Sequence, residues 1–327
     1  MDKRPIMRIV QLAVMAGLFA GACSPAVQAQ QTFTYRGMCD ASAAVALGPD
    51  HFIVADDEVN TLQIYRRNRE VAVGAVDLSA FLGTEPDKES DLEGAAAIGA
   101  RIYWISSHGR NKDGEEKKRR YQFFATDIHT GSTPTVVPVG ASYTGLLKDL
   151  LGAPGLAPYK LAAAAKLAPK AAGGLNIEGL AATPEGQLLI GFRSPLAGNK
   201  ALLLPLTNPS QLLLGKRANF GAPIELDLGG RGIRSIELVG ASYLIIAGPA
   251  GENGDFALYR WSGKVADQPL ALHNAALNGL HPEALFAMPA ARTIQILSDD
   301  GSARINGATC KDLHQSAQSF RSFIVLP

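Results

Sequence analysis

Short apolar segments alternate with turn residues along most of the chain and predict β-strands. Residues 51–55, 101–105 and 187–191 are strongly apolar, and each follows a turn that contains Asp or Gly. A segment rich in small residues precedes each of them, and a segment of alternating apolar and polar positions comes after it. Short strands separated by such turns predict antiparallel β-meanders.

One motif recurs five times and opens each of these groups of strands. The copies read DASAAVALG, DLEGAAAIG, NIEGLAATP, GIRSIELVG and HPEALFAMP, and they begin at Asp40, Asp91, Asn176, Gly232 and His281. Their small residues suit strands that crowd around a central axis, and four-stranded sheets repeated around an axis form a β-propeller. We therefore predict an all-β chain with a β-propeller fold.

The spacing of the motif sets the number of blades. Its third positions are Ser42, Glu93, Glu178, Arg234 and Glu283. The intervals between them are 51, 85, 56 and 49 residues. The long second interval contains residues 141–172, whose Leu- and Ala-rich composition predicts helices broken by Pro. We predict five blades with this helical insertion between blades two and three, and six blades as the alternative.

The first residues have the pattern of a secretory leader. Lys3, Arg4 and Arg8 precede an apolar run that is too short to span a bilayer. Cleavage after Ala29 predicts a signal peptide over 1–29 and one mature β-propeller domain over 30–327. Lipid anchoring through Cys23 is the less favoured alternative. We expect an exported protein, periplasmic or secreted, with no transmembrane span.

Both ends of the mature chain carry features expected where a propeller ring closes. Residues 32–36 and 322–326 are short β-rich segments that could complete the last blade, whose third strand we place at 302–308. Cys39 and Cys310 lie near the same seam. An even pair of cysteines in an exported chain predicts a disulfide, with two buried free thiols as the alternative.

The repeat also predicts where polar side chains gather. In an antiparallel pair the start of one strand lies beside the end of the next, so these positions face one end of the propeller axis. The third motif positions form a first ring. Beside it we place the motif starts Asp40, Asp91, Asn176 and His281. The ends of the second strands add Asp56, Asp57, Glu58, Ser107, His108, Arg110, Arg193, Asp299 and Asp300.

Carboxylates dominate this predicted axial face. Glu93, Glu178 and Glu283 cannot all ionise cheaply near one axis unless cations offset them. Arg234, Arg193 and Arg110 could offset part of this charge, and so could a bound ion. Oxygen-rich ligand sets suit calcium, so we predict a calcium site at the three glutamates. The alternative is that carboxylates cap the blade ends by accepting backbone N–H groups.

Several strings resemble those of one bacterial family. GMCDASAAVALG, DLEGAA, RIYWISSHGRNKDG, LNIEGLAATPEG, GGRGIRSIE and ILSDDG are similar to motifs of a secreted domain family of unknown function, number 3616 (DUF3616). The resemblance runs from Tyr35 to about Leu326. It implies a distant similarity to phytase-like β-propellers and carries no established activity, because fold does not imply function.

Three functions follow as hypotheses, and whether the protein is an enzyme stays open. The first is binding of a small ligand, a cation or a partner on the axial face, because the sequence has no recognisable catalytic triad or zinc spacing. The second is a calcium-assisted, phytase-like hydrolase of phosphate esters or lactones. The third is an envelope interaction scaffold. A net charge of +1 argues against nucleic-acid binding, and we expect a monomer.

Overall fold

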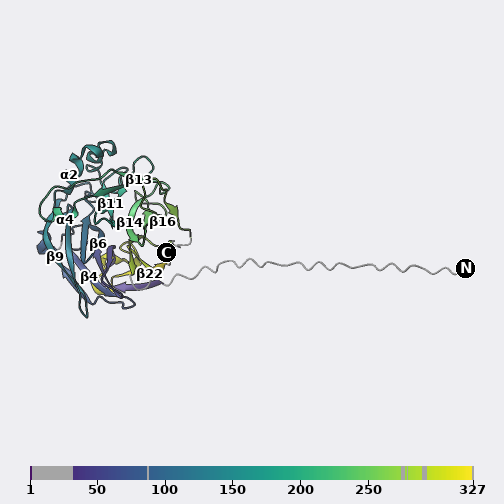
Figure 1. Cartoon of the computed structure of the whole chain (residues 1–327). Helices are drawn as coiled ribbons and strands as arrows, with labels where there is room; N and C mark the ends of the chain where they lie inside the picture. Colours follow the sequence, from purple (N-terminus) through teal and green to yellow (C-terminus); the bar gives the residue numbers. More distant parts are fainter. Residues whose placement is uncertain (2–31, 87, 274–276, 278, 289–292, 326–327) are drawn as a thin grey trace.

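Five four-stranded antiparallel sheets surround a common axis, which confirms the predicted five-bladed β-propeller (Figure 1). The structure is a computed structural model that describes residues 1, 32–86, 88–273, 277, 279–288 and 293–325. The apolar run, the cleavage site and Cys23 of the predicted leader lie outside the described residues.

Each of the first four blades is a continuous meander with its first strand nearest the axis. Blade one contains β2 (Ala41–Ala46), β3 (His51–Asp56), β4 (Thr61–Arg66) and β5 (Gly74–Asp77). Blade two contains β6 (Leu92–Ile98), β7 (Arg101–Ser106), β8 (Phe123–His129) and β9 (Thr135–Tyr143). Blade three contains β10 (Asn176–Ala182), β11 (Leu188–Ser194), β12 (Ala201–Leu206) and β13 (Ile224–Leu226). Blade four contains β14 (Gly232–Val239), β15 (Ser242–Gly248), β16 (Ala257–Trp261) and β17 (Leu270–Ala271).

The fifth blade is built from both ends of the chain. Its inner strands are β18 (Pro282–Met288) and β19 (Thr293–Ser298), its third strand is β22 (Ser319–Val325), and its outermost strand is β1 (Thr32–Arg36). β1 pairs with β22 from Thr32↔Phe323 to Arg36↔Ser319. Both terminal segments named from the sequence therefore take part in closing the ring.

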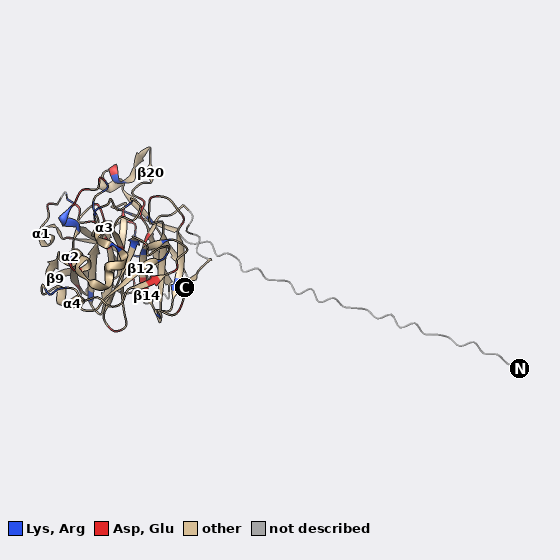
Figure 2. Ribbon diagram, turned by 90° about the horizontal axis from the view of Figure 1, so that it is seen from above, with Lys and Arg blue, Asp and Glu red and all other residues tan. Residues whose placement is uncertain are grey.

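The expectation that residues 302–308 form the third strand of blade five is wrong. That segment instead forms the small hairpin of β20 (Arg304–Ile305) and β21 (Ala308–Thr309), a sheet of its own that projects from the body (Figure 2). Asn306 and Gly307 both have positive φ and make a tight turn between them. β22 takes the third place because its Phe323 and Val325 pack in one apolar cluster with residues of β19.

The helical insertion between blades two and three is present. It contains α2 (Leu146–Gly152), the 3₁₀ segment η2 (Pro154–Tyr159) and α3 (Leu161–Ala164), and it begins after 141 because β9 continues to Tyr143. Leu146, Leu150 and Leu161 pack in one core cluster with Ile177 and Ile190 of blade three. The insertion is thus docked against the propeller. The remaining short helical segments are α1 (Ser79–Leu82), α4 (Pro209–Leu212), η1 (Lys118–Arg120), η3 (Cys310–Asp312) and η4 (Gln315–Ala317).

Small residues in the inner strands allow neighbouring blades to approach closely. A Cβ built on Gly179 of β10 would lie 2.7 Å from Cγ2 of Ile233 in the next blade, and one on Gly94 of β6 would lie 3.1 Å from Cβ of Leu180. The fourth position of the motif is occupied by Ala43, Gly94, Gly179, Ser235 and Ala284. This position is small in every copy, as expected for strands crowded around an axis.

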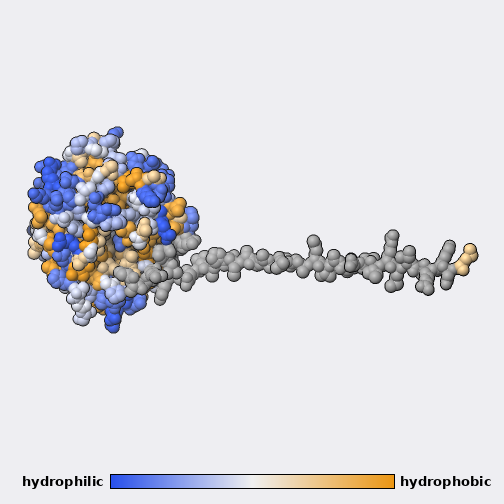
Figure 3. Space-filling view, in the orientation of Figure 1, coloured by the Kyte–Doolittle hydropathy of each residue, from blue (hydrophilic) through white to orange (hydrophobic). Residues whose placement is uncertain are grey.

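A disulfide joins Cys39 to Cys310, which confirms the predicted pair and rules out the free thiols. The two Cα atoms are 6.0 Å apart, although the cysteines are separated by 271 positions. The bond ties the start of blade one to the loop that follows the β20–β21 hairpin. Within the described residues no helix has the length and apolar character needed to cross a membrane. On the face of the molecule seen in Figure 3, hydrophilic and hydrophobic residues are mixed.

Candidate functional site

A β-bulge in each inner strand sets apart the third residue of the motif. In blade two the ladder passes from Leu92↔Ser106 to Gly94↔Ile105, so Glu93 has no partner strand residue. The same register shift skips Ser42, Glu178, Arg234 and Glu283 in the other four blades. A bulge leaves one residue outside the ladder and bends the strand locally. All five of these ring residues are buried.

The ends of the second strands lie beside the motif starts. Asn176 pairs with Ser194 in blade three, and Pro282 pairs with Ser298 in blade five. An isolated bridge between Asp40 and Asp299 joins blade one to blade five. The structure therefore brings these positions to one end of the axis, and it divides them into two parts with different charge balance.

The first part is an ion-pair network that we call the paired side, formed by Glu178, Arg193, Arg234 and Glu283. Glu178 Oε1 accepts from Arg193 Nη1 at 3.0 Å and from Asn176 Nδ2 at 2.7 Å. Its Oε2 lies 2.8 Å from Arg234 Nε, and Arg234 Nη2 contacts Glu283 Oε1. Two arginines thus compensate two glutamates, and all four side chains are buried.

The second part is a group of carboxylates that we call the acidic side, formed by Asp40, Asp57, Glu58, Asp91 and Glu93. Oxygen atoms of Asp57, Asp91 and Glu93 lie within 4.8 Å of one another, and so do those of Asp40, Asp57 and Glu58. Asp57 belongs to both sets. Its Oδ1 is buried and has no hydrogen-bond partner among the described residues.

Burial and mutual repulsion make the carboxyl groups of Asp40, Asp57 and Glu93 hard to ionise. Burial, with repulsion from Glu93, raises the pKa of Asp57 well above its ordinary value, and burial with repulsion from Glu178 does the same to the pKa of Glu93. Burial, with repulsion from Asp299, raises the pKa of Asp40 to about 9. A bound cation would reverse this effect, because it favours the ionised form of each ligand.

Cations from the 3₁₀ segments η1 and η3 reach the edge of the acidic side. Arg120 Nη1 lies 3.0 Å from Asp91 Oδ2, and the same guanidinium bonds Glu89. Lys311 Nζ lies 2.8 Å from Glu58 Oε1. Burial raises the pKa of Asp91 to about 6, although Arg120 opposes the rise. These contacts hold the rim of the site in place.

Asp91 is further fixed by its own loop. Its backbone has a φ of 58°, a left-handed conformation in which few residues other than Gly, Asn and Asp are found. Ser107 Oγ donates to Asp91 Oδ2, the oxygen that also contacts Arg120. Among the described residues the other oxygen, Oδ1, accepts no hydrogen bond, so one ligand atom of Asp91 is free of protein donors.

Several predicted face residues have structural partners instead. Asp56 accepts the Glu58 N–H at 2.9 Å, and Asp299 accepts the Gly301 N–H at 2.8 Å, as expected for carboxylates that cap turns. Asp300 is bonded by both the backbone and the guanidinium of Arg321. Ser42 is buried, and its hydroxyl donates to Asp40 O at 3.4 Å.

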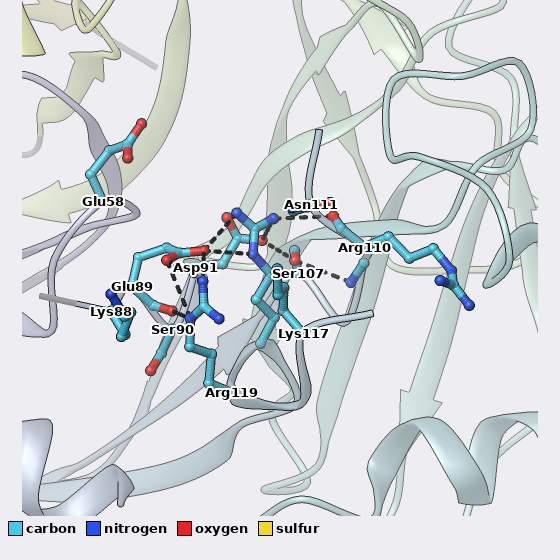
Figure 4. A network of polar contacts seen from close by, with 12 residues as sticks. Glu58, Lys88, Glu89, Ser90, Asp91, Ser107, Arg110, Asn111, Lys117 and Arg119 are labelled. Carbon is cyan, nitrogen blue, oxygen red and sulfur yellow. Dashed lines mark hydrogen bonds and ion pairs between the residues drawn. The ribbon is translucent and has the colours of Figure 1, made fainter. Parts of the chain in front are cut away.

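Among the described residues, His108, His281 and Arg110 form no ion pair with the carboxylates. Arg110 donates through Nε to Ala165 O at 2.9 Å and so ties blade two to the helical insertion; in Figure 4 its side chain points away from Asp91. His108 is buried and stacks on Tyr121, and burial lowers its pKa to about 4. His281 is exposed at the rim, with its ring near Phe256.

Two cations that contact the acidic side, Arg120 and Lys311, are absent from the residues predicted from the sequence. Arg120 ends the charged segment 109–120, whose residues follow no periodic pattern. Lys311 directly follows Cys310, and the predicted Cys39–Cys310 bond would have placed it beside Asp40. The predicted disulfide was therefore a sequence signal for the position of Lys311, although not for that of Arg120.

A family model matches part of the chain. Residues 133–295 match the family described as "Protein of unknown function (DUF3616)", in agreement with the resemblance noted in the sequence. No curated protein matches the sequence.

Solved structures of other proteins show a related outline at low identity. One is a putative oxidoreductase (glucose dehydrogenase) from Thermus thermophilus, with 12% identity, a TM-score of 0.46, and coverage of 90% of this chain and 100% of that chain. A second is the PQQ-bound aldose sugar dehydrogenase from Streptomyces coelicolor, with 12% identity, a TM-score of 0.42, and coverage of 90% and 99%. A third is Trypanosoma rangeli sialidase, with 10% identity, a TM-score of 0.40, and coverage of 80% and 43%.

Proposed function

We propose that this chain, which belongs to the DUF3616 family through residues 133–295, binds a small ligand through a calcium ion held on its acidic side. One observation carries the proposal. Oxygens of Asp57, Asp91 and Glu93 lie within 4.8 Å of one another, and the buried Oδ1 of Asp57 has no hydrogen-bond partner among the described residues.

The chemistry of these ligands favours calcium. Calcium takes six to eight oxygen ligands in flexible geometries, and carboxylates are its usual protein ligands. The sequence pattern predicts Glu93, Glu178 and Glu283 for this role. We keep Glu93 and replace the other two by Asp57 and Asp91, because Glu178 and Glu283 are bonded to buried arginines.

A small ligand would complete the coordination. Three carboxylates alone do not fill the six to eight positions that calcium takes, so oxygen atoms from outside the protein are needed. A carboxylate, a phosphate or vicinal hydroxyl groups supply such oxygens. The axial face would then act as a binding site in which calcium is the main contact.

The ion pairs of the nearby arginines favour ligand binding over hydrolysis as the function. Arg120, Arg193 and Arg234 are each paired with a carboxylate, so none of them is free to neutralise the charge that develops on a phosphoryl or acyl group. A calcium-assisted hydrolase of phosphate esters or lactones would use the same carboxylates. Assays with chromogenic esters, lactones and phosphates, with and without calcium, distinguish the two.

Calcium titration followed by calorimetry and thermal unfolding tests the proposal. We expect saturating calcium to raise the melting temperature by several degrees, since a ligand at 100 times its Kd stabilises by about 2.7 kcal/mol. Asp57→Asn and Glu93→Gln should each weaken binding at least tenfold. Asp127→Asn is the matched control, because Asp127 pairs with Arg101 at the surface of blade two. Equal calcium affinity in all four proteins would overturn the proposal.

Export to an oxidising compartment forms part of the same proposal. It is supported by the leader pattern over 1–29 and by the Cys39–Cys310 disulfide. Mass spectrometry of the protein recovered from its producing cell would show a first residue of Gln30. A chain that begins at Met1, or at a lipid-modified Cys23, would contradict cleavage after Ala29.

A further inference from the structure

A pocket of about 330 Å³ lies between the helical insertion and the loop that precedes β13. α2 and η2 form one wall, and residues 217–223 form the other. Figure 1 shows α2 at the rim of the molecule, whereas β6 and β14 lie near its centre. The pocket has a volume in the range of ligand sites in proteins.

A buried carboxylate orients an arginine at this pocket. Asp149 of α2 is 4% exposed at its side chain and accepts three hydrogen bonds, from the Tyr143 hydroxyl, Arg217 Nε at 2.8 Å and the Ala218 N–H at 2.9 Å. Arg217 is 75% exposed at its side chain. Among the described residues its two Nη groups have no hydrogen-bond partner, and Nη2 lies along the end of α2 near Gly152.

Apolar side chains line part of the rest of the pocket, beside the exposed polar side chain of Asn219. Leu156 of η2 is buried, and Phe220 is half-buried and packs against the same core cluster. Pro154 and Pro223 add two further rigid apolar faces. The pocket therefore offers a planar cationic group together with apolar side chains, a combination that suits an amphipathic anion.

We propose that this pocket binds a small carboxylate with an apolar body. The Nη groups of Arg217 bond the carboxylate in the planar, two-bond geometry that guanidinium groups favour. Leu156 and Phe220 contact the apolar body. Asp149 holds the guanidinium in place before the ligand arrives, so little side-chain entropy is lost on binding.

The position of the insertion agrees with this role. α2 supplies Asp149 and Gly152, and η2 supplies Leu156, so one wall of the pocket exists only because the chain departs from the regular blade pattern here. The proposal is independent of calcium on the axial face, because none of the lining residues belongs to the acidic side or to the paired side.

Saturation-transfer NMR and calorimetry with 4-phenylbutyrate, and with 4-phenylbutanol as its neutral counterpart, test the proposal on the full chain. We expect the carboxylate to bind at least tenfold more tightly than the alcohol. Arg217→Gln should remove this difference. Arg66→Gln is the matched control, because Arg66 Nε also bonds an aspartate, Asp50, at 2.9 Å but lines no part of this pocket.

A second variant fills the pocket and leaves Arg217 in place. A Cβ at Gly155 meets no atom within 4 Å, so Gly155→Leu should fold and should abolish binding of both compounds. Equal affinity for the carboxylate and the alcohol would overturn the proposal. So would unchanged binding in Gly155→Leu, or no binding of 4-phenylbutyrate by the wild type up to its solubility limit.

Discussion

Glu93 and Glu178 occupy the same bulge position in neighbouring blades, yet their carboxylates have opposite surroundings. Glu178 is bonded by two arginines and one asparagine amide. Glu93 faces Asp57 and Asp91 and has no ion pair within 4.0 Å among the described residues. The two glutamates share the same backbone bulge, so the chemistry at each position depends on the charges that its own blade and the adjacent blades present.

Neutralising these two glutamates should therefore change stability in opposite directions. Glu178→Gln leaves Arg193 buried without an opposite charge and removes one of the two carboxylates that pair with Arg234, and we expect a loss of about 3 kcal/mol, as for one partner of a buried pair. Glu93→Gln removes like-charge repulsion and should be neutral or stabilising without calcium. Urea unfolding of both variants in a chelating buffer measures the difference. Equal losses would show that the two sides of the ring do not differ in charge balance.

The bulge itself could be anticipated only in part. The repeat identifies Glu93, Glu178 and Glu283 as equivalent positions, and in the structure each of them lies at the bulge of its inner strand. It does not reveal that Arg234, a fourth copy of the position, reaches two of them. The partners Arg120 and Lys311 come from the 3₁₀ segments η1 and η3, which lie outside the repeat, so no periodic pattern predicts their position. Charge balance at the axis therefore depends on contacts that the sequence pattern does not encode.

At the scale of elements, packing between inner strands also shifts the pKa of a carboxyl group. Glu237 of β14 lies against β18 of the next blade, where Ala287 supplies a backbone hydrogen bond. Burial raises the pKa of Glu237 to about 8, and that bond only partly opposes the rise. The folded protein keeps a proton on Glu237 that the unfolded chain releases near pH 4.5.

This difference predicts a pH dependence of stability. The contribution of protonated Glu237 is fully present below about pH 4.5 and is lost as the pH rises toward 8, by at most about 1.4 kcal/mol per pH unit. Glu237→Gln should flatten the stability curve between pH 5 and 8 relative to the wild type. Glu116→Gln, at an exposed loop position, is the control and should leave the slope unchanged. A wild-type slope in Glu237→Gln would contradict the burial of this carboxyl group.

Most elements follow from the pattern, and the exceptions have physical causes. The inner strands and the insertion were predictable because both depend on local composition. The third strand of blade five was not, because residues 302–308 alternate in character although Asn306 and Gly307 turn them into a hairpin. Choosing β22 instead required knowing that Phe323 packs beside Ile294 and Ile296, which are distant in sequence from it.

At the scale of the whole molecule, one covalent bond and two terminal strands hold the ring closed. The disulfide encloses 271 positions of chain, and blade five combines residues from both ends. Reduction, or the double substitution Cys39→Ser with Cys310→Ser, should lower the free energy of unfolding by about 2–5 kcal/mol. Urea unfolding with and without dithiothreitol measures it. The double variant should not respond to dithiothreitol, and an unresponsive wild type would contradict the prediction.

Because blade five combines strands from both ends of the described chain, it can be completed only after β22 has been synthesised. While the chain is being made, β19 and β1 both wait for β22, which lies between them and is translated after all the other described strands. Until then the outer edge of β19 offers unpaired N–H and C=O groups, and such edges pair readily with other chains. A chain that stops before β22 would thus have four complete blades and an incomplete fifth blade. We expect proteases of protein quality control to recognise the exposed edge of β19 in such a chain.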